Sequence, residues 1–143
     1  MTIMDNITTR TFAGIERPVA TPSNISSLRD DEIFVFGSNL AGMHGGGAAR
    51  FAFENFGAKW GCGVGMSGKT YAIPTMQGGV GTIAPYVEDF IAFAKNHPDL
   101  YFYVTRIGCG IAGFKDREIA PLFASALDLP NVALPESFIS VLK

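Results

Sequence analysis

The chain lacks the features that mark disulfide-stapled, zinc-binding and membrane proteins. It has two cysteines, Cys62 and Cys109, each placed between glycines, and without a Cys-x-x-Cys pair they suggest neither a disulfide framework nor a zinc site. No apolar run approaches the roughly 18 residues of a membrane-spanning helix. The opening residues, MTIMDNITTRTF, contain no apolar stretch typical of a secretory signal. We therefore expect a soluble, cytoplasmic protein without a membrane partner.

Net positive charge is also missing. The 11 Lys and Arg residues stand against 13 Asp and Glu residues, which gives a formal net charge of -2 at pH 7. Broad binding to nucleic acid needs clustered basic residues, so this class of function is disfavoured. An anionic small ligand stays compatible with the composition, because backbone N–H groups bind phosphate without net positive charge.

Apolar residues, by contrast, are plentiful enough for a sizeable core. The 143 residues are 48% hydrophobic and include 12 Phe, which fits one globular domain. Residues 1–28 are rich in Thr, Ser, Asn and Pro, with apolar residues at irregular spacing, and this predicts an irregular N-terminal lead-in. We place a single domain at residues 29–143.

Short apolar runs alternate with amphipathic segments along that domain. Runs rich in β-branched and aromatic residues predict strands, and helical spacing of apolar residues predicts helices, the last with Asp116 as N-cap. The expected strands span residues 32–36, 70–74, 100–107 and 131–134, and the expected helices span residues 48–56, 85–96 and 117–127. This order predicts an α/β fold, a three-layer α/β/α sandwich around a mixed, largely parallel sheet.

Two glycine-rich loops each follow an expected strand and precede an expected helix. They are GSNLAGMHGGG at residues 37–47 and GCGIAGF at residues 108–114. Ligands of α/β sheets settle at the carboxyl ends of strands, where glycines admit close backbone contact and helix N-termini attract anions. A pyrophosphate would suit this geometry. The first loop has neither a Walker Gly-Lys-Ser/Thr ending nor a GxGxxG fingerprint with a following acid, which disfavours an ordinary kinase or dehydrogenase.

Longer stretches around these loops resemble the macrodomain superfamily. FVFGSNLAGMHGGGAARFAFENFGA is similar to the macrodomain segment in which a strand ends in an asparagine, passes a glycine-rich loop and enters a helix. TYAIPT resembles the strand after it, and TRIGCGIAGFKDREIAPLFASAL resembles the second macrodomain loop with its helix. The pieces cover residues 32 to about 135 in the family's order. The resemblance implies a compact, divergent macrodomain-like protein of bacterial or phage type with an ADP-ribose site.

The resemblance also implies roles for individual residues. It puts Asn39 near the distal ribose, residues 45–47 and 110–113 around the diphosphate, and Phe114 on a ribose. Asn39, from the resemblance, and His44, a loop histidine that departs from the family and belongs to a residue type whose ordinary pKa suits proton transfer, are the candidate catalytic residues. No cofactor or metal is expected. The candidate ligand-binding residues are Gly37, Ser38, Asn39, Gly45, Gly46, Gly47, Arg106, Gly108, Cys109, Gly110, Ile111, Ala112, Gly113 and Phe114. The family's usual Asn-Ala-Ala-Asn strand end is replaced by FGSN, and the N-terminal part that commonly supplies an adenine-binding aspartate is unmatched.

Four of these residues also have structural interpretations, which the sequence leaves open. Asn39 contacts a ribose or water, or satisfies its own turn. His44 acts as a general base or ribose ligand, or is an exposed loop histidine. Arg106 clamps phosphate or pairs with an internal carboxylate. Cys109 is a nucleophile or, as we favour, a small residue in a tight turn.

Residues outside the two loops are less informative. Asp116 and Glu118 are expected to be acids of a helix start and nothing more. Cys62, within a glycine-rich stretch, either flanks the ligand or belongs to an irregular connection, and nothing local decides between these.

Three functions fit these patterns. The first, which we favour, is a module that reads, senses or sequesters ADP-ribose or a related NAD-derived nucleotide. The second is an ADP-ribosyl hydrolase in which Asn39 or His44 positions water. The third is a structural or protein-interaction domain whose glycine loops only shape turns and whose exposed aromatics form a homo-oligomer interface.

Overall fold

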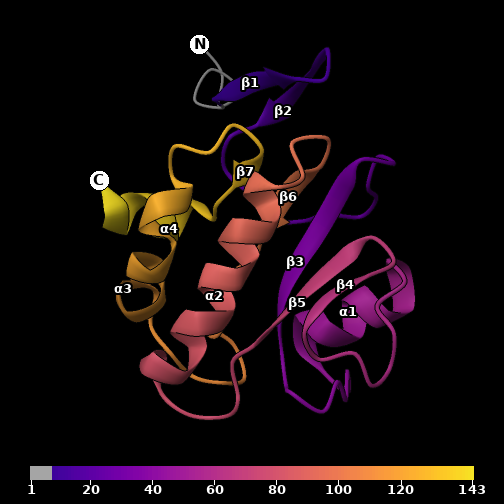
Figure 1. Ribbon diagram of the computed structural model, residues 1–143, viewed down its shortest axis with the longest axis vertical. Coiled ribbons are helices and arrows are strands. Elements are labelled where there is room, and N and C mark those ends of the chain that lie inside the picture. Colours follow the sequence, from indigo (N-terminus) through magenta and orange to yellow (C-terminus); the bar gives the residue numbers. More distant parts are fainter. Residues whose placement is uncertain (1–7) are drawn as a thin grey trace.

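Strand β3 lies at the centre of the sheet in the computed structural model, which describes residues 8–143 (Figure 1). These residues form a five-stranded sheet of order β4-β5-β3-β6-β7, in which β4 is antiparallel to β5 and the other neighbours are parallel. The strands span Glu32–Ser38 (β3), Gly65–Ser67 (β4), Thr70–Pro74 (β5), Tyr101–Val104 (β6) and Val132–Ala133 (β7). The prediction of an α/β fold with a mixed, largely parallel sheet is confirmed.

The central place of β3 follows from its two apolar faces. Ile33 and Val35 pack into one core cluster, and Phe34 and Phe36 pack into another on the opposite face. Successive side chains of a strand point to opposite faces, so an uninterrupted apolar run is stable only where both faces are covered. The sheet therefore needs cover on each side.

Helices supply most of that cover. The helices α2 (Val80–Lys95), α3 (Asp116–Ile119) and α4 (Glu136–Leu142), with the 3-10 helix η2 (Ala120–Ala126), pack on the Ile33 face, and α1 (Gly47–Asn55) packs on the Phe34 face. Figure 1 shows α2, α3 and α4 on one side and α1 on the other. In residues 8–143 no helix is both long and apolar enough to cross a bilayer.

The N-terminal segment covers the rest of the α1 face, and here the prediction of an irregular lead-in is wrong. Among the described residues of that region, β1 (Thr9–Phe12) and β2 (Ile15–Pro18) form an antiparallel hairpin. Its turn residues, Ala13 and Gly14, both have positive φ, 51° and 77°, as a two-residue hairpin turn requires. The Ala-Gly pair lacks the Asn-Gly or Asp-Gly signal that would have revealed the turn. Residues 1–7 of the expected lead-in lie outside the described residues.

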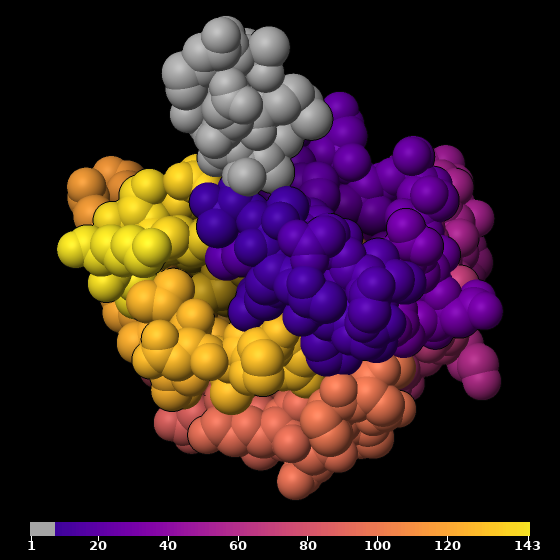
Figure 2. Space-filling view, turned by 90° about the horizontal axis from the view of Figure 1, so that it is seen from above, coloured from indigo at the N-terminus to yellow at the C-terminus, as the bar shows by residue number. Residues whose placement is uncertain are grey.

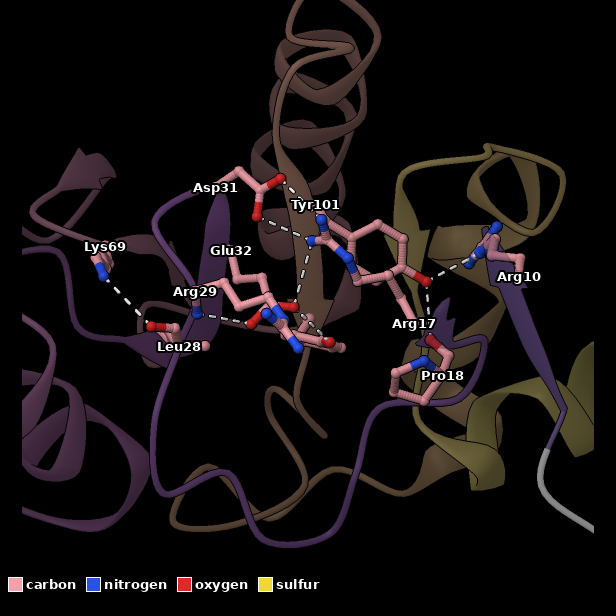
Figure 3. Close-up of polar contacts among 10 residues, drawn as sticks. Arg10, Arg17, Pro18, Leu28, Arg29, Asp31, Glu32, Lys69 and Tyr101 are labelled. Atoms are coloured by element: carbon pink, nitrogen blue, oxygen red, sulfur yellow. Dashed lines mark hydrogen bonds and ion pairs between the residues drawn. The ribbon is translucent and has the colours of Figure 1, made fainter. Parts of the chain in front are cut away.

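A buried arginine fastens this hairpin to the sheet (Figure 3). Arg17 is 1% exposed and donates two hydrogen bonds of 2.9 Å to the carboxylate of Asp31, with a third of 3.3 Å to Glu32. Its guanidinium also lies over the rings of Phe12 and Tyr101. The charge is thus paired and stacked, as a buried guanidinium requires, and its Nε is buried without a hydrogen-bond partner among the described residues.

A second arginine extends the attachment to the far strands. Arg10 donates to the hydroxyl of Tyr101 at 2.9 Å and to the carbonyls of Leu129 and Val132. We call Arg10 and Arg17, with these partners, the arginine latch. Figure 2 shows the indigo N-terminal segment lying against the yellow C-terminal segment, in agreement with the short parallel bridge between Ala20 and Leu134.

Several element boundaries differ from the predicted ones. Helix α2 begins at Val80, five residues before the expected start, and keeps Pro85 inside; proline favours a first helical position but does not always occupy it. The expected helix 117–127 is divided into α3 and η2, and its N-cap is Lys115 rather than Asp116. The short strand β4 and the helix α4 were not predicted.

Candidate functional site

A cleft of about 230 Å³ opens at the carboxyl ends of β3, β5 and β6, where the two glycine loops meet. Ten of the predicted ligand-binding residues line it. They are Gly37, Ser38, Asn39, Gly46, Gly47, Arg106, Gly108, Gly110, Ile111 and Ala112. The other four, Gly45, Cys109, Gly113 and Phe114, are not among the lining residues.

The structure adds lining residues that the sequence analysis missed. These are Met43, Ala48, Ala49, Thr75, Met76, Thr105 and Ile107. Thr75 and Met76 directly follow β5, so the rule that ligands lie beyond the carboxyl ends of strands would have found them had it been applied to this strand.

Asn39 stabilises the first loop with both ends of its side-chain amide. Its Oδ1 accepts a hydrogen bond of 2.8 Å from the Met43 N–H, and its Nδ2 donates one of 2.8 Å to the Met43 carbonyl. Of the two interpretations left open, the turn residue is the one that the structure shows. The residue still lines the cleft, but its amide is already engaged.

A neighbouring backbone segment supports the same loop from behind. The Gly61 N–H donates to the Gly42 carbonyl at 2.8 Å, and a Cβ on Gly63 would overlap the Asn39 carbonyl oxygen. Only glycine at position 63 allows the two backbones to lie this close. The segment around Cys62 is therefore a support for the loop and does not itself line the cleft.

His44 lies in the interior rather than in the cleft. It is 1% exposed, its Nε2 donates to the Lys59 carbonyl at 2.9 Å, and its ring packs against Phe36 and Trp60. Its Nδ1 is buried without a hydrogen-bond partner among the described residues. The interpretation as an exposed loop histidine is wrong, and His44 is not among the residues that line the cleft.

The N-terminus of α1 faces the cleft without a capping side chain. Gly46 is its N-cap in extended conformation, Gly47 follows with φ of 58°, and the first turn holds no acidic residue. The first N–H groups of a helix have no partner within the helix and carry a partial positive charge. Because no carboxylate of its first turn satisfies them, they are available to an anion.

The second loop closes on itself and reaches toward the first. The Gly113 N–H donates to the Gly110 carbonyl at 3.0 Å, and the Phe114 N–H donates to the Gly108 carbonyl at 2.8 Å. At its apex Ile111 is 73% exposed, and its Cδ1 lies 3.4 Å from the position of a Cβ on Gly46. Phe114 packs against the main core and is not among the residues that line the cleft. Its ribose contact stays a prediction of the resemblance.

Arg106 is the one charged residue among those lining the cleft. Its Nε and Nη2 donate to the two carboxylate oxygens of Asp116 at 2.9 and 2.8 Å, which is the internal pairing left open by the sequence. These bonds hold the pKa of the Asp116 carboxyl below its usual value and raise the pKa of Arg106. Burial, with the Asp116 charge, raises the pKa of Cys109 to about 11, as befits a small structural thiol rather than a nucleophile.

The lining is suited to holding an anion and poor in groups that move protons. None of the residues lining the cleft is Asp, Glu, His or Lys. Within residues 8–143 no group of three or more His, Cys, Asp and Glu side chains is placed to hold a metal ion.

A second hollow, of about 350 Å³, continues the cleft over the start of α1. The two share Gly47, Ala48 and Thr105. Its other walls come from the segment Pro22–Ile25 and from Phe34 and Phe51, and the Phe51 side chain is 38% exposed. A ligand longer than the cleft therefore has room to extend toward an accessible aromatic ring.

No family model, no curated protein and no solved structure matches this chain. The resemblance to macrodomains rests on the quoted motifs and remains a prediction.

Proposed function

We propose that the chain binds ADP-ribose or a related NAD-derived nucleotide, as a module that reads, senses or sequesters it. One observation carries the proposal: the unneutralised N-terminus of α1, the second glycine loop and Arg106 converge on one cleft. A diphosphate offers two negative charges to these donors, and helix N-termini and arginine are the usual partners of phosphate.

The size of the hollows supports a ligand of more than one part. Small-molecule sites typically enclose about 300 to 1,000 Å³, and the cleft of about 230 Å³ falls below that range on its own. With the diphosphate in the cleft, the hollow beside Phe51 has room for a ribose or a base, and the flat face of a base stacks well on an aromatic ring.

The lining also favours binding over hydrolysis. General acid–base catalysis needs a titratable group within hydrogen-bond reach of the substrate, and no carboxylate or imidazole is among the lining residues. Asn39 is engaged with the Met43 backbone, and His44 is buried. We therefore expect an ADP-ribosylated substrate to keep its ADP-ribosyl group in the presence of the protein.

Titration calorimetry with ADP-ribose, followed by NAD, AMP and cyclic ADP-ribose, tests the proposal. Gly110 lines the cleft, and a Cβ at this position would have no atoms within 4 Å, so Gly110→Glu adds a carboxylate to the site with little strain. We expect it to weaken binding about tenfold or more, since like charges in a partly buried site repel strongly.

Two matched variants separate charge from shape and place. Gly110→Gln adds the same volume without charge, and Gly81→Glu adds the charge at a glycine of α2 that has equal space but does not line the cleft. Both should bind ADP-ribose more tightly than Gly110→Glu. Absence of binding by the unaltered protein, or equal affinity of all three variants, would sink the proposal and favour an interaction domain.

A further inference from the structure

Asp116 connects three parts of the chain beside the cleft. Besides its two hydrogen bonds with Arg106, its Oδ1 accepts one of 2.9 Å from the Ser137 hydroxyl of α4 and lies 3.7 Å from the Cys109 sulfur. An acid at the start of a helix needs none of these contacts. The interpretation of Asp116 as a helix-start acid and nothing more is therefore wrong.

Arg106 and Asp116 differ in their position relative to the cleft. Arg106 lines the cleft and its side chain is 57% exposed, whereas Asp116 does not line it and is 25% exposed. The carboxylate engages Nε and Nη2 of the guanidinium, and Nη1 has no hydrogen-bond partner among the described residues. One edge of Arg106 is thus fixed to the fold while the other stays available.

We propose that Asp116 is a positioning residue, anchored by Ser137, that orients Arg106 so that its Nη1 edge meets a phosphate of the bound nucleotide. The inference rests on the proposed function. A free arginine of this exposure samples many rotamers, which a ligand must restrict on binding. Pre-organisation by the carboxylate removes that entropic cost. For one side chain, removing this cost raises the affinity roughly two- to tenfold.

A double-mutant cycle on ADP-ribose affinity tests this. Asp116→Ala should weaken binding by roughly two- to tenfold, and Arg106→Ala should weaken it further because the phosphate contact itself is lost. In the Arg106→Ala background, Asp116→Ala should have no additional effect, because a positioning residue acts only through the group that it orients.

Two further variants distinguish positioning from charge and from folding. Glu118 lies in the same helical turn, and its side chain accepts from the Lys115 N–H rather than from Arg106. Glu118→Ala removes an equal charge and should leave affinity unchanged. Asp116→Asn keeps polar atoms that can hydrogen-bond with Ser137. It replaces Asp116→Ala in the cycle if the alanine variant does not unfold cooperatively and is therefore misfolded.

The outcomes separate this inference from the function on which it rests. If the unaltered protein binds no nucleotide, both fall. If the unaltered protein binds and the losses of affinity in Asp116→Ala and Arg106→Ala add in the double variant, the positioning role is overturned while the proposed function stands. Tighter binding by Asp116→Ala would have the same consequence.

Discussion

Polar residues of the first loop act mainly on their own chain. Asn39 uses both ends of its amide on one backbone unit, that of Met43, and His44 completes an aromatic cluster between Phe36 and Trp60. In both cases the side chain serves the packing of the protein itself. This leaves backbone N–H groups and Arg106 as the donors available to the proposed nucleotide.

Cys109 is expected to be a slow nucleophile in the folded protein. Burial raises the pKa of its thiol from 9.0 to about 11, so its thiolate fraction near pH 8 falls roughly 100-fold below that of the unfolded chain. Iodoacetamide should alkylate Cys109 roughly 100-fold more slowly in buffer than in concentrated urea. Mass spectrometry of a Cys62→Ser variant, in which Cys109 is the remaining thiol, measures the two rates.

The same thiol makes stability depend on alkaline pH. Because the folded pKa is the higher one, the contribution of the thiol to stability is fully present below about pH 9 and is lost as the pH rises toward 11.

In the alkylation experiment, equal rates in folded and unfolded protein would contradict the buried environment of Cys109.

At the scale of elements, the first glycine loop and the segment behind it form one tightly packed unit. The close approach of Gly63 to the Asn39 carbonyl leaves no space for a methyl group. We expect Gly63→Ala to lower the free energy of unfolding by about 1 to 3 kcal/mol, the usual range for overpacking. Gly45→Ala, at a position with no atoms within 4 Å, is the matched control and should change it little.

Urea unfolding of the two variants measures this difference. If Gly63→Ala were as stable as Gly45→Ala, the two backbones would not be in contact. Loss of ADP-ribose affinity in Gly63→Ala alone would further show that the supporting segment sets the shape of the first loop.

Elements with strong local signals were predictable. The runs IFVF and YFYV are apolar throughout and form β3 and β6, and the glycines that follow them mark the edge where the cleft opens. Physical rules for strands and loops, together with the resemblance, therefore located ten of the lining residues.

Features set by distant contacts were not predictable. His44 is buried because Phe36 and Trp60, from separate segments, enclose it. β4 has three residues and is defined by pairing with β5 rather than by its own composition. The pairing of Arg106 with Asp116 joins a loop to a helix ten residues later, and the local sequence supports a phosphate contact equally well.

For the whole molecule, the arginine latch joins the first described strands to the last. Replacing Arg17 with methionine leaves Glu32 buried without its cation, and breaking one side of a buried pair costs about 3 to 5 kcal/mol. Arg50→Met is the matched control, since its pair with Glu54 is exposed and such pairs contribute about 0.5 kcal/mol or less.

Acid should reduce the difference in free energy of unfolding between the Arg17→Met variant and the unaltered protein. Hydrogen bonds from Arg17 hold the pKa of Asp31 below its usual value, so the stabilisation is present above about pH 4 and is lost as the pH falls through the folded value. Urea unfolding at a series of pH values measures this. If the difference in free energy of unfolding stays constant down to pH 2, Arg17 does not stabilise the fold through Asp31.

The latch also sets an order of events during synthesis. Arg10 is synthesised well before its carbonyl partners Leu129 and Val132, which lie 119 and 122 residues later. The hairpin therefore cannot complete its contacts with the sheet until these residues are made, and Tyr101 and Tyr103 lack the cover of Phe12 until it docks. Translation pauses after β6 would lengthen the life of an intermediate with an exposed aromatic surface, the kind of species that chaperones recognise.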